Sequence, residues 1–451
     1  MVSIAGALER VKDDLPELIE QHVQEGLEAL PGFAWRNRLL NPLVTLLLFM
    51  MQIMHGNTAI THLRHYWPQR FSATAYCKAR MRLPLALVQH VIGSVSRQLR
   101  AAHEPAVPRW RGHRIWRADG TSFSMPDTPA LQAHFGQPGQ QRSGCGFPVA
   151  TLMVLCDAAG FIVKTLALPL RTHEGSQLQH LHEELEAGDV LVYDRAGCSY
   201  VHLALLSQHQ MHGIVRIHQR KIVSFRDGRK HAGKMPKTQR KGHPTSQWLA
   251  CLGEQDQLVR WFKPARRPRW MQQDEYDALP DTLELRELRF SVHRKGFRSK
   301  SVILVTTLVD AETYPACELA DQYLDRWQIE VNFRDLKQTM KMDVLKCKTV
   351  EGVLKELAVF TLIYNLVRLV MLRAATRQNV EVDRISFVDA LRWLREAANG
   401  HHTILFALVV NPKRPGRVEP RVVKRRPKEY PRMTQPRQEL RNVLILQGVT
   451  N

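Results

Sequence analysis

The feature that most constrains the fold is an ordered series of short apolar runs between residues 113 and 217. Their length and periodicity predict strands at residues 113–119, 148–156 and 161–170, a helix at 175–186, a strand at 189–193, a helix at 200–208 and a strand at 213–217. Three strands followed by helix, strand, helix and strand is an α/β order. We therefore expect an α/β core in this part of the chain.

The residues before this core have a helical pattern throughout. Apolar positions recur at helical spacing, with breaks at turn-forming glycine and proline residues. Asn57 and Ser72 are predicted N-caps of two short helices. The second helix, residues 72–83, carries three cations and has two interpretations: a helix-turn-helix-like DNA-binding unit, or a solvated basic face.

The residues after the core strands predict an insertion and then a second helical region. Residues 218–300 are basic and irregular, β-rich stretches follow at 282–292 and 301–307, and a helical pattern resumes at Pro315, a favoured first-turn residue. Residues 412–437 are rich in Pro, Lys and Arg, which indicates an extended arm. The predicted organisation is a helical N-terminal DNA-binding domain (1–107), an α/β core in two parts (108–217 and 303–345), a β-rich basic insertion (218–302), and a helical C-terminal region with the basic arm (346–451).

The charge of the chain indicates a polyanionic partner. Its 451 residues contain 64 Lys and Arg against 43 Asp and Glu, a formal charge of +21. Because each phosphate that a cation neutralises releases a counterion, such an excess favours nucleic acid, with an anionic membrane surface as the second candidate. The apolar runs at 43–54 and 357–372 are better explained as buried helices than as membrane spans, since the first is too short and the second is interrupted by Asn365 and Arg368.

The cysteines and the N-terminus indicate a cytoplasmic protein. The seven cysteines include no CxxC pair, so neither a disulfide framework nor a cysteine-based zinc site is expected. The first residues are amphipathic and carry acids early, unlike a secretion signal.

The strongest local motif runs from Tyr323 to Lys337. At about 100° per residue, Tyr323, Arg326, Glu330 and Lys337 fall on one narrow face of a helix. An adjacent apolar face predicts packing on a core by Ile329, Phe333, Leu336 and Met340. A carboxylate held between an arginine and a lysine stays ionised, and the cations can bind phosphates on either side of it. On periodicity alone, a surface helix with ion pairs is an equally good interpretation.

Two further carboxylates stand where predicted buried strands end. Asp119 closes the run at 113–119, and Asp194 follows the run at 189–193. Acids in such places are costly unless they are paired or bound to metal. Asp189 is an alternative to Asp194, although it falls in the turn before the strand. Three convergent carboxylates suit two Mg²⁺ or Mn²⁺ ions, so Asp119, Asp194 and Glu330 are the predicted catalytic and metal-binding residues.

These segments resemble the DDE transposases of bacterial insertion sequences, in particular the insertion-sequence-four group. The signature of that group is Tyr, Arg, Glu and Lys with two, three and six residues between them, and Tyr323, Arg326, Glu330 and Lys337 match this spacing at every position. The match extends to Asp119-Gly-Thr121, Gly144–Pro148, Gly188-Asp189, Asp194-Arg195, Arg417–Arg421 and Lys424–Lys428, and more weakly to Cys77–Arg80.

The resemblance implies a ribonuclease-H-like catalytic core with a β-rich insertion, an architecture that the element order at 113–217 also fits. It implies an enzyme that nicks and joins DNA at insertion-sequence ends through a hairpin intermediate, acting as a homodimer on transposon-end and target DNA. Arg195, Arg326 and Lys337 would bind the DNA and Tyr323 a phosphate of the strand end. A flipped base would stack on a tryptophan, with Trp327, Trp261 and Trp270 as candidates and ordinary core packing as the alternative for each.

Two other functions fit part of the pattern. A ribonuclease-H-like nuclease without strand transfer would keep the three acids but would not need the Tyr-Arg-Lys stripe. A domesticated or inactive DNA-binding protein would keep the basic surface but would not need the acids. A nucleotide cofactor is not expected, because the near match to a phosphate-binding loop at 228–235 has Met235 where Ser or Thr should bind Mg²⁺.

Overall fold

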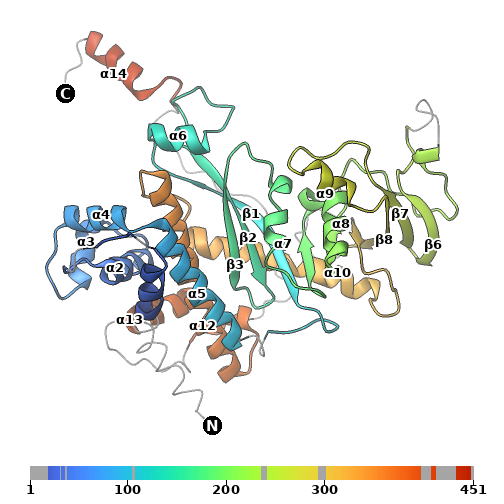
Figure 1. Cartoon of the computed structure of the whole chain (residues 1–451), viewed down its shortest axis with the longest axis horizontal. Coiled ribbons are helices and arrows are strands. Elements are labelled where there is room, and N and C mark those ends of the chain that lie inside the picture. Colours follow the sequence, from blue (N-terminus) through green and yellow to red (C-terminus); the bar gives the residue numbers. More distant parts are fainter. Residues whose placement is uncertain are drawn as a thin grey trace.

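A nine-stranded mixed sheet forms the centre of the protein (Figure 1). The computed structural model describes residues 19–30, 32–35, 38–103, 107–234, 241–292, 301–397, 408–412 and 433–447. From edge to edge the strand order is β3-β2-β1-β4-β5-β9-β8-β7-β6. The strands are β1 (Ile115–Ser124), β2 (Val149–Asp157), β3 (Ile162–Pro169), β4 (Val190–Tyr193), β5 (His212–Arg216), β6 (Gln247–Gly253), β7 (Asp256–Phe262), β8 (Thr282–Ser291) and β9 (Ser301–Thr306).

The strands predicted between residues 113 and 217 all form, and they are neighbours in the sheet. β1 pairs antiparallel with β2 and parallel with β4, and β4 pairs parallel with β5. The mixed α/β architecture is therefore confirmed. β1 is longer than predicted, because its pairing with β2 continues to Ser124. Asp119 consequently lies within the strand and not at its end.

The basic region after β5 adds four strands to the same sheet. β9 pairs antiparallel with β5, and β8, β7 and β6 follow as successive antiparallel neighbours. The sequence predicted β8 and β9 but not β6 and β7. β6 is partly exposed along most of its length, so its residues lack the alternation of a half-buried strand. Between β7 and β8 lies a short helix, α9 (Gln273–Asp277).

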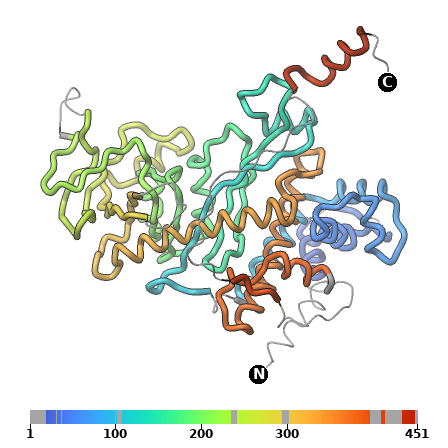
Figure 2. The backbone as a smooth tube through the Cα atoms, turned by 180° about the vertical axis from the view of Figure 1, so that it is seen from behind, coloured from blue at the N-terminus to red at the C-terminus, as the bar shows by residue number. Residues whose placement is uncertain are grey.

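Helices cover both faces of the first five strands. Successive side chains of a strand point to opposite faces, so Val190 and Val192 of β4 pack with α10 (Ala316–Asp325), while Leu191 and Tyr193 pack with α7 (Gln179–His182). After α10 come α11 (Trp327–Arg334) and a π-helical turn, η7 (Asp335–Thr339). Together they form the gold helical run that crosses the molecule in Figure 2.

A long buried helix, α12 (Val350–Gln378), joins the sheet to the N-terminal helices. It is long and apolar enough to cross a membrane, but 89% of its apolar window is buried inside the protein, as predicted for a core helix. Both side-chain amide atoms of Asn365 bond the backbone of Ile162 in β3, at 2.9 and 2.8 Å. Arg368 donates to Asp383 at 3.1 Å. The polar interruptions of the apolar run therefore attach α12 to its neighbours.

The N-terminal helical unit, residues 19–103, packs on α12 (Figure 1). Ser72 caps its helix as predicted, accepting from Ala75 N at 3.1 Å. Its elements are a helix at 19–28, α2 (Pro42–Met54), α3 (Ile60–Leu63), η1 (Arg64–Tyr66), α4 (Ala73–Arg82) and α5 (Leu85–His103).

The remaining elements, outside the N-terminal unit, are α6 (Pro129–Phe135), η3 (Glu174–Ser176), η4 (Arg195–Gly197), α8 (Tyr200–Gln208), η5 (Ala232–Lys234), η8 (Val382–Arg384), α13 (Phe387–Ala397) and α14 (Arg437–Leu446).

Two local predictions are wrong. Asn57 is not an N-cap: α3 begins three residues later, and Asn57 is fully buried with φ 51°. Residues 175–186 do not form one helix, only the single turn of α7 after η3. The apolar positions that predicted this helix, Leu178, Leu181 and Leu185, are nevertheless buried in one cluster with residues of the sheet. Their spacing therefore reports burial and not a continuous helix. Most of the predicted arm, and Met235, lie outside the described residues.

Candidate active site

Strand register places Asp119 level with Asp194. The parallel pairing of β1 with β4 ends at Arg117 opposite Val192. Continued by two residues, this register brings Asp119 opposite Asp194 on the neighbouring segment. β4 ends at Tyr193, so Asp194 lies just beyond the strand that pairs with β1 on this side.

Alternation turns both carboxylates toward α10 and α11. Asp194 follows Val190 and Val192 at even spacing, and Asp119 follows Ile115 in the same way. Those three apolar residues pack in one cluster with Leu319 and Tyr323 of α10. The acids therefore face the helical run that carries Glu330.

The predicted helix from Tyr323 to Lys337 forms in three joined segments. It tightens at Arg326, whose N–H bonds the carbonyl of Tyr323, and it widens into the π-turn where Met340 N bonds Asp335 O. Such π-turns are frequent at functional sites. The apolar face is confirmed: Ile329, Phe333, Leu336 and Met340 are all buried in the main core cluster.

Asp119, Asp194 and Glu330 line one cavity of about 570 Å³. Arg326 and Lys337 line it as well. The other lining residues are Gly120, Thr121, Phe333, Arg334, Gln338 and Asp343. The cavity thus collects the three predicted acids and the two signature cations, and Asp189 is not among its lining residues.

Arg326 lies between two of these acids. Its Nη1 is 2.5 Å from Oδ2 of Asp119, and its Nη2 is 3.8 Å from Oε1 of Glu330. Burial raises the pKa of the Asp119 carboxyl, and the charge of Asp194 adds to this, whereas Arg326 and the Gly120 N–H oppose it. A buried carboxylate beside a second acid needs a cation, and here the guanidinium supplies part of that charge.

The donor chemistry fits a hard divalent cation. Carboxylate oxygens are the ligands that Mg²⁺ and Mn²⁺ prefer. The Arg326 guanidinium already contacts the carboxylates of Asp119 and Glu330, so both acids face positive charge at this point. In the described part of the chain, no three His, Cys, Asp or Glu side chains are already grouped closely enough to hold an ion.

Asp189, the alternative to Asp194, has a structural role. It is 2% exposed and precedes β4, and its carboxylate accepts from Arg114 at 2.7 and 3.0 Å and from Glu186 N at 2.8 Å. These bonds close the turn before the strand. Both carboxylate oxygens of Asp189 therefore accept hydrogen bonds from neighbouring residues, and neither lines the cavity.

Glu174 is an acid that the sequence analysis missed. A β-carbon at Gly120 would lie 2.6 Å from Oε1 of Glu174, so glycine lets this carboxylate pack against β1 beside Asp119. Burial raises the pKa of Glu174, with the charges of Asp194 and Asp119 as further causes. No periodicity signals this position, because it depends on the turn η3 packing against η4, the turn that follows Asp194.

The residues assigned to DNA contact lie at different depths. Tyr323 is 7% exposed and packs in the core, with the Arg326 guanidinium carbon 5.6 Å from its ring centre. Arg195 donates to Gln219 at 2.6 Å. Trp327 is 40% exposed.

The other two tryptophan candidates are engaged within the protein. Trp261 is 4% exposed, donates to Glu287 at 2.9 Å and lies under the ammonium of Lys221. Trp270 is stacked on His202 with ring centres 5.1 Å apart. Of the three, Trp327 is the most exposed candidate.

Comparison with known proteins identifies the family of the chain. Residues 110–366 match the family described as Transposase DDE domain. The transposase InsG for insertion sequence element IS4, from Escherichia coli strain K12, is 27% identical over 377 residues, which cover 79% of this chain and 78% of InsG. The cryo-EM structure of the piggyBac transposase synaptic complex with hairpin DNA aligns with a TM-score of 0.44 and 10% identity, covering 88% of this chain and 80% of that chain. The family match spans more than half of the chain, which therefore belongs to the Transposase DDE domain family and is a DDE transposase of the IS4 type.

Proposed function

We propose that this transposase nicks and joins DNA at the ends of an insertion sequence, by cut-and-paste through a hairpin intermediate, with Asp119, Asp194 and Glu330 as its metal ligands. The observation that carries the proposal is that two strands and one helix deliver these three acids to one cavity. When bound, two Mg²⁺ or Mn²⁺ ions would activate the attacking oxygen and stabilise the leaving one.

The cations of the cavity would position the DNA. Arg326 can exchange its carboxylate partner for a phosphate of the strand end, since both are anionic oxygen pairs that a guanidinium binds in the same way. Lys337 belongs to the π-turn and lines the same cavity. In the sequence, Arg326 precedes Glu330 and Lys337 follows it. A base flipped at the hairpin would stack on Trp327, and Arg195 and Tyr323 would hold the adjacent backbone.

The signature cations separate strand transfer from simple nicking. We expect Arg326→Ala and Lys337→Ala to lower hairpin and joined products by about ten- to a hundredfold, the value of one or two charge-assisted bonds, and to lower the first nick less. The assay is a labelled DNA end with Mg²⁺, scored for nick, hairpin and joined product. Mn²⁺ binding without DNA, followed by electron paramagnetic resonance, should persist in both variants.

Arg334→Ala is the matched control, because Arg334 lines the same cavity on the same helix but stands outside the signature. If the two signature variants yield all three products at wild-type levels, their cations are surface charges only. A nuclease without strand transfer would show the nick alone in every variant.

The positive charge should act mainly through DNA phosphates. Between about 50 and 200 mM salt, duplex affinity should fall by about a thousandfold or more, as for proteins with six to ten phosphate contacts. Deleting residues 412–451 should flatten the plot of log affinity against log salt, since the arm is rich in Lys and Arg. The measurement is fluorescence anisotropy, with sucrose as an uncharged control. An affinity independent of salt would refute this role of the charge.

Further parts of the proposal concern architecture and assembly. The first five strands, in the order β3-β2-β1-β4-β5, support a ribonuclease-H-like core, with β6, β7 and β8 within its insertion. We propose that the enzyme acts as a homodimer on paired DNA ends in the bacterial cytoplasm. The protruding α14 supports a dimer, because it exposes Val443, Leu444, Ile445 and Leu446 (Figure 1).

A further inference from the structure

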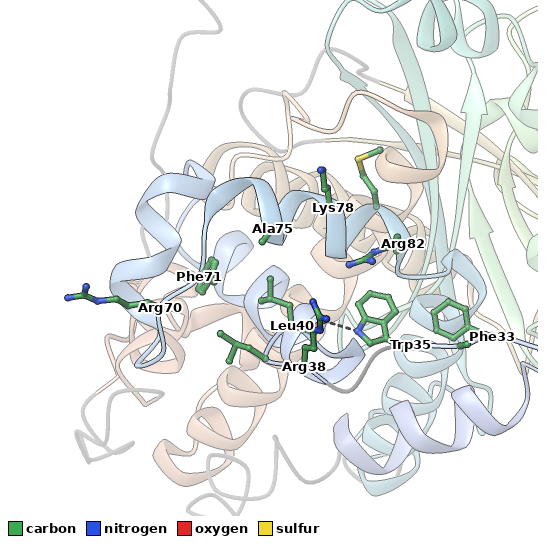
Figure 3. A pocket seen from close by; sticks show the side chains of 12 residues that line it. Phe33, Trp35, Arg38, Leu40, Arg70, Phe71, Ala75, Lys78 and Arg82 are labelled. Atoms are coloured by element: carbon green, nitrogen blue, oxygen red, sulfur yellow. Dashed lines mark hydrogen bonds between the residues drawn. The ribbon is translucent and has the colours of Figure 1, made fainter.

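A second cavity lies in the N-terminal helical unit and shares no lining residue with the acidic one. It has a volume of about 940 Å³ and opens between α4 and residues 33–35 and 38–40 (Figure 3). We call it the N-terminal groove. Lys78 and Arg82 of α4 form one wall, and Trp35 and Arg38 stand opposite. A cavity of this size is in the upper range of those that hold a drug-sized ligand.

The groove is positive and without acids. Among its described lining residues, four are cations and none is Asp or Glu; the cations, all exposed, are Arg38, Arg70, Lys78 and Arg82. The sequence around it shows the same bias, since residues 29–103 contain nine Lys or Arg and no Asp or Glu. Charge complementarity therefore favours a polyanionic ligand for this groove.

The floor of the groove is aromatic and apolar, which a phosphate site would not need. Trp35 is fixed in place by donating from Nε1 to the carbonyl of Leu40 at 2.9 Å. Arg82 holds its guanidinium carbon 5.3 Å from the Trp35 ring centre. Phe71 is half-buried on the same floor, near Leu40. Cations beside aromatic faces are the combination that binds unpaired nucleotides, because each base offers a π-face and each phosphate a charge.

We propose that the N-terminal groove binds a stretch of unpaired DNA, with phosphates on Arg38 and Arg70 and a base against Phe71 and Trp35. A duplex is a poorer occupant, because its bases are stacked on each other and present no free face to the floor. This proposal rests on the proposed function for its ligand, since a transposase that opens DNA ends produces unpaired nucleotides.

The test measures binding without cleavage. A labelled oligothymidylate of about 20 nucleotides, the site size of one or two binding folds, is titrated in the presence of a chelator and compared with a duplex of equal length. Phe71→Leu keeps an apolar floor but removes the ring. The pair Arg38→Gln and Arg70→Gln removes two groove charges. The matched control, Arg64→Gln with Arg97→Gln, removes two exposed charges of the same unit outside the groove.

Phe71→Leu should weaken single-strand binding about fivefold or more and change duplex binding less than twofold. The Arg38 and Arg70 pair should lower the salt slope for the single strand by about 1.4, from about 0.7 for each phosphate, and the control pair should lower it less. Wild-type single-strand affinity in both groove variants overturns the proposal, provided circular dichroism shows them folded. An equal loss of duplex and single-strand binding also overturns it, and identifies a backbone site.

The failure of this proposal is distinguishable from failure of the proposed active site. Every groove measurement is repeated in Asp119→Asn, which lacks one carboxylate of the acidic cavity. If Asp119→Asn still nicks DNA, the assignment of the active site is wrong whatever the groove does. If it binds the single strand as the wild type does, the groove is a separate site.

Discussion

Asp119→Asn, Asp194→Asn and Glu330→Gln should each lower DNA nicking by about a thousandfold or more. Each change keeps the shape of the side chain and removes the anionic oxygen that a hard divalent ion needs. Metal ions contribute several kcal/mol to such reactions, and each 1.36 kcal/mol is a factor of ten in rate. The measurement is single-turnover nicking of a labelled DNA end with saturating Mg²⁺, so that binding does not limit the rate.

The control for this prediction is another acid of the same cavity. Asp343 lines it and is exposed, but it belongs neither to the strand pair nor to the signature helix. Asp343→Asn should retain nicking within about tenfold, the effect of one lost surface charge on local electrostatics being small. DNA affinity in the presence of a chelator should stay near the wild-type value in all four proteins. An acid whose replacement leaves nicking within tenfold is not a member of the catalytic set.

Glu356→Ala should destabilise the protein by about 3–5 kcal/mol. Glu356 is completely buried on α12 and accepts four hydrogen bonds from three residues. Asn57 Nδ2 donates to Oε1 at 2.6 Å, Lys346 N donates to both oxygens at 3.0 and 3.1 Å, and Cys347 N donates to Oε2 at 2.8 Å. Removing the carboxylate leaves the Asn57 and Cys347 donors buried without an acceptor, which is the costly case.

Glu356→Gln separates loss of the acceptor from loss of volume. The amide keeps one carbonyl oxygen and the size of the side chain, so its destabilisation should fall between those of alanine and the wild type. Asp321→Ala, at an exposed acid of α10, should change stability by less than about 0.5 kcal/mol. Denaturant unfolding followed by far-ultraviolet circular dichroism measures all three. A midpoint unchanged in Glu356→Ala would show that these bonds contribute nothing net.

The three acids predicted to be catalytic could be found in the sequence because each stands beside a strong local pattern. Asp119 and Asp194 adjoin apolar runs, and Glu330 shares a helix face with spaced cations. The register that brings Asp119 opposite Asp194 could not be found, since it depends on which strands pair. The sequence analysis also ended the strand at Asp119, whereas β1 continues to Ser124. The polar residues after Asp119 lack a hydrophobic pattern and are strand only because they pair with β2.

Long-range polar contacts explain the remaining misses. Asn57 has the composition of a helix cap, and a local rule could not show that its amide is committed to Glu356, 299 residues away. Glu174 is similar, because its place beside Gly120 is set by two turns meeting in space. In both cases the residue is polar, the local sequence allows several uses for it, and only the folded arrangement decides among them.

The continuity of the nine-stranded sheet has a consequence for how its two parts can move. β5 and β9 are hydrogen-bonded neighbours, so backbone bonds join the first five strands to the four that follow in the sheet. The two parts should therefore move as one body. A force on β6–β9 would be transmitted through β5 to β4 and β1, the strands beside Asp194 and Asp119.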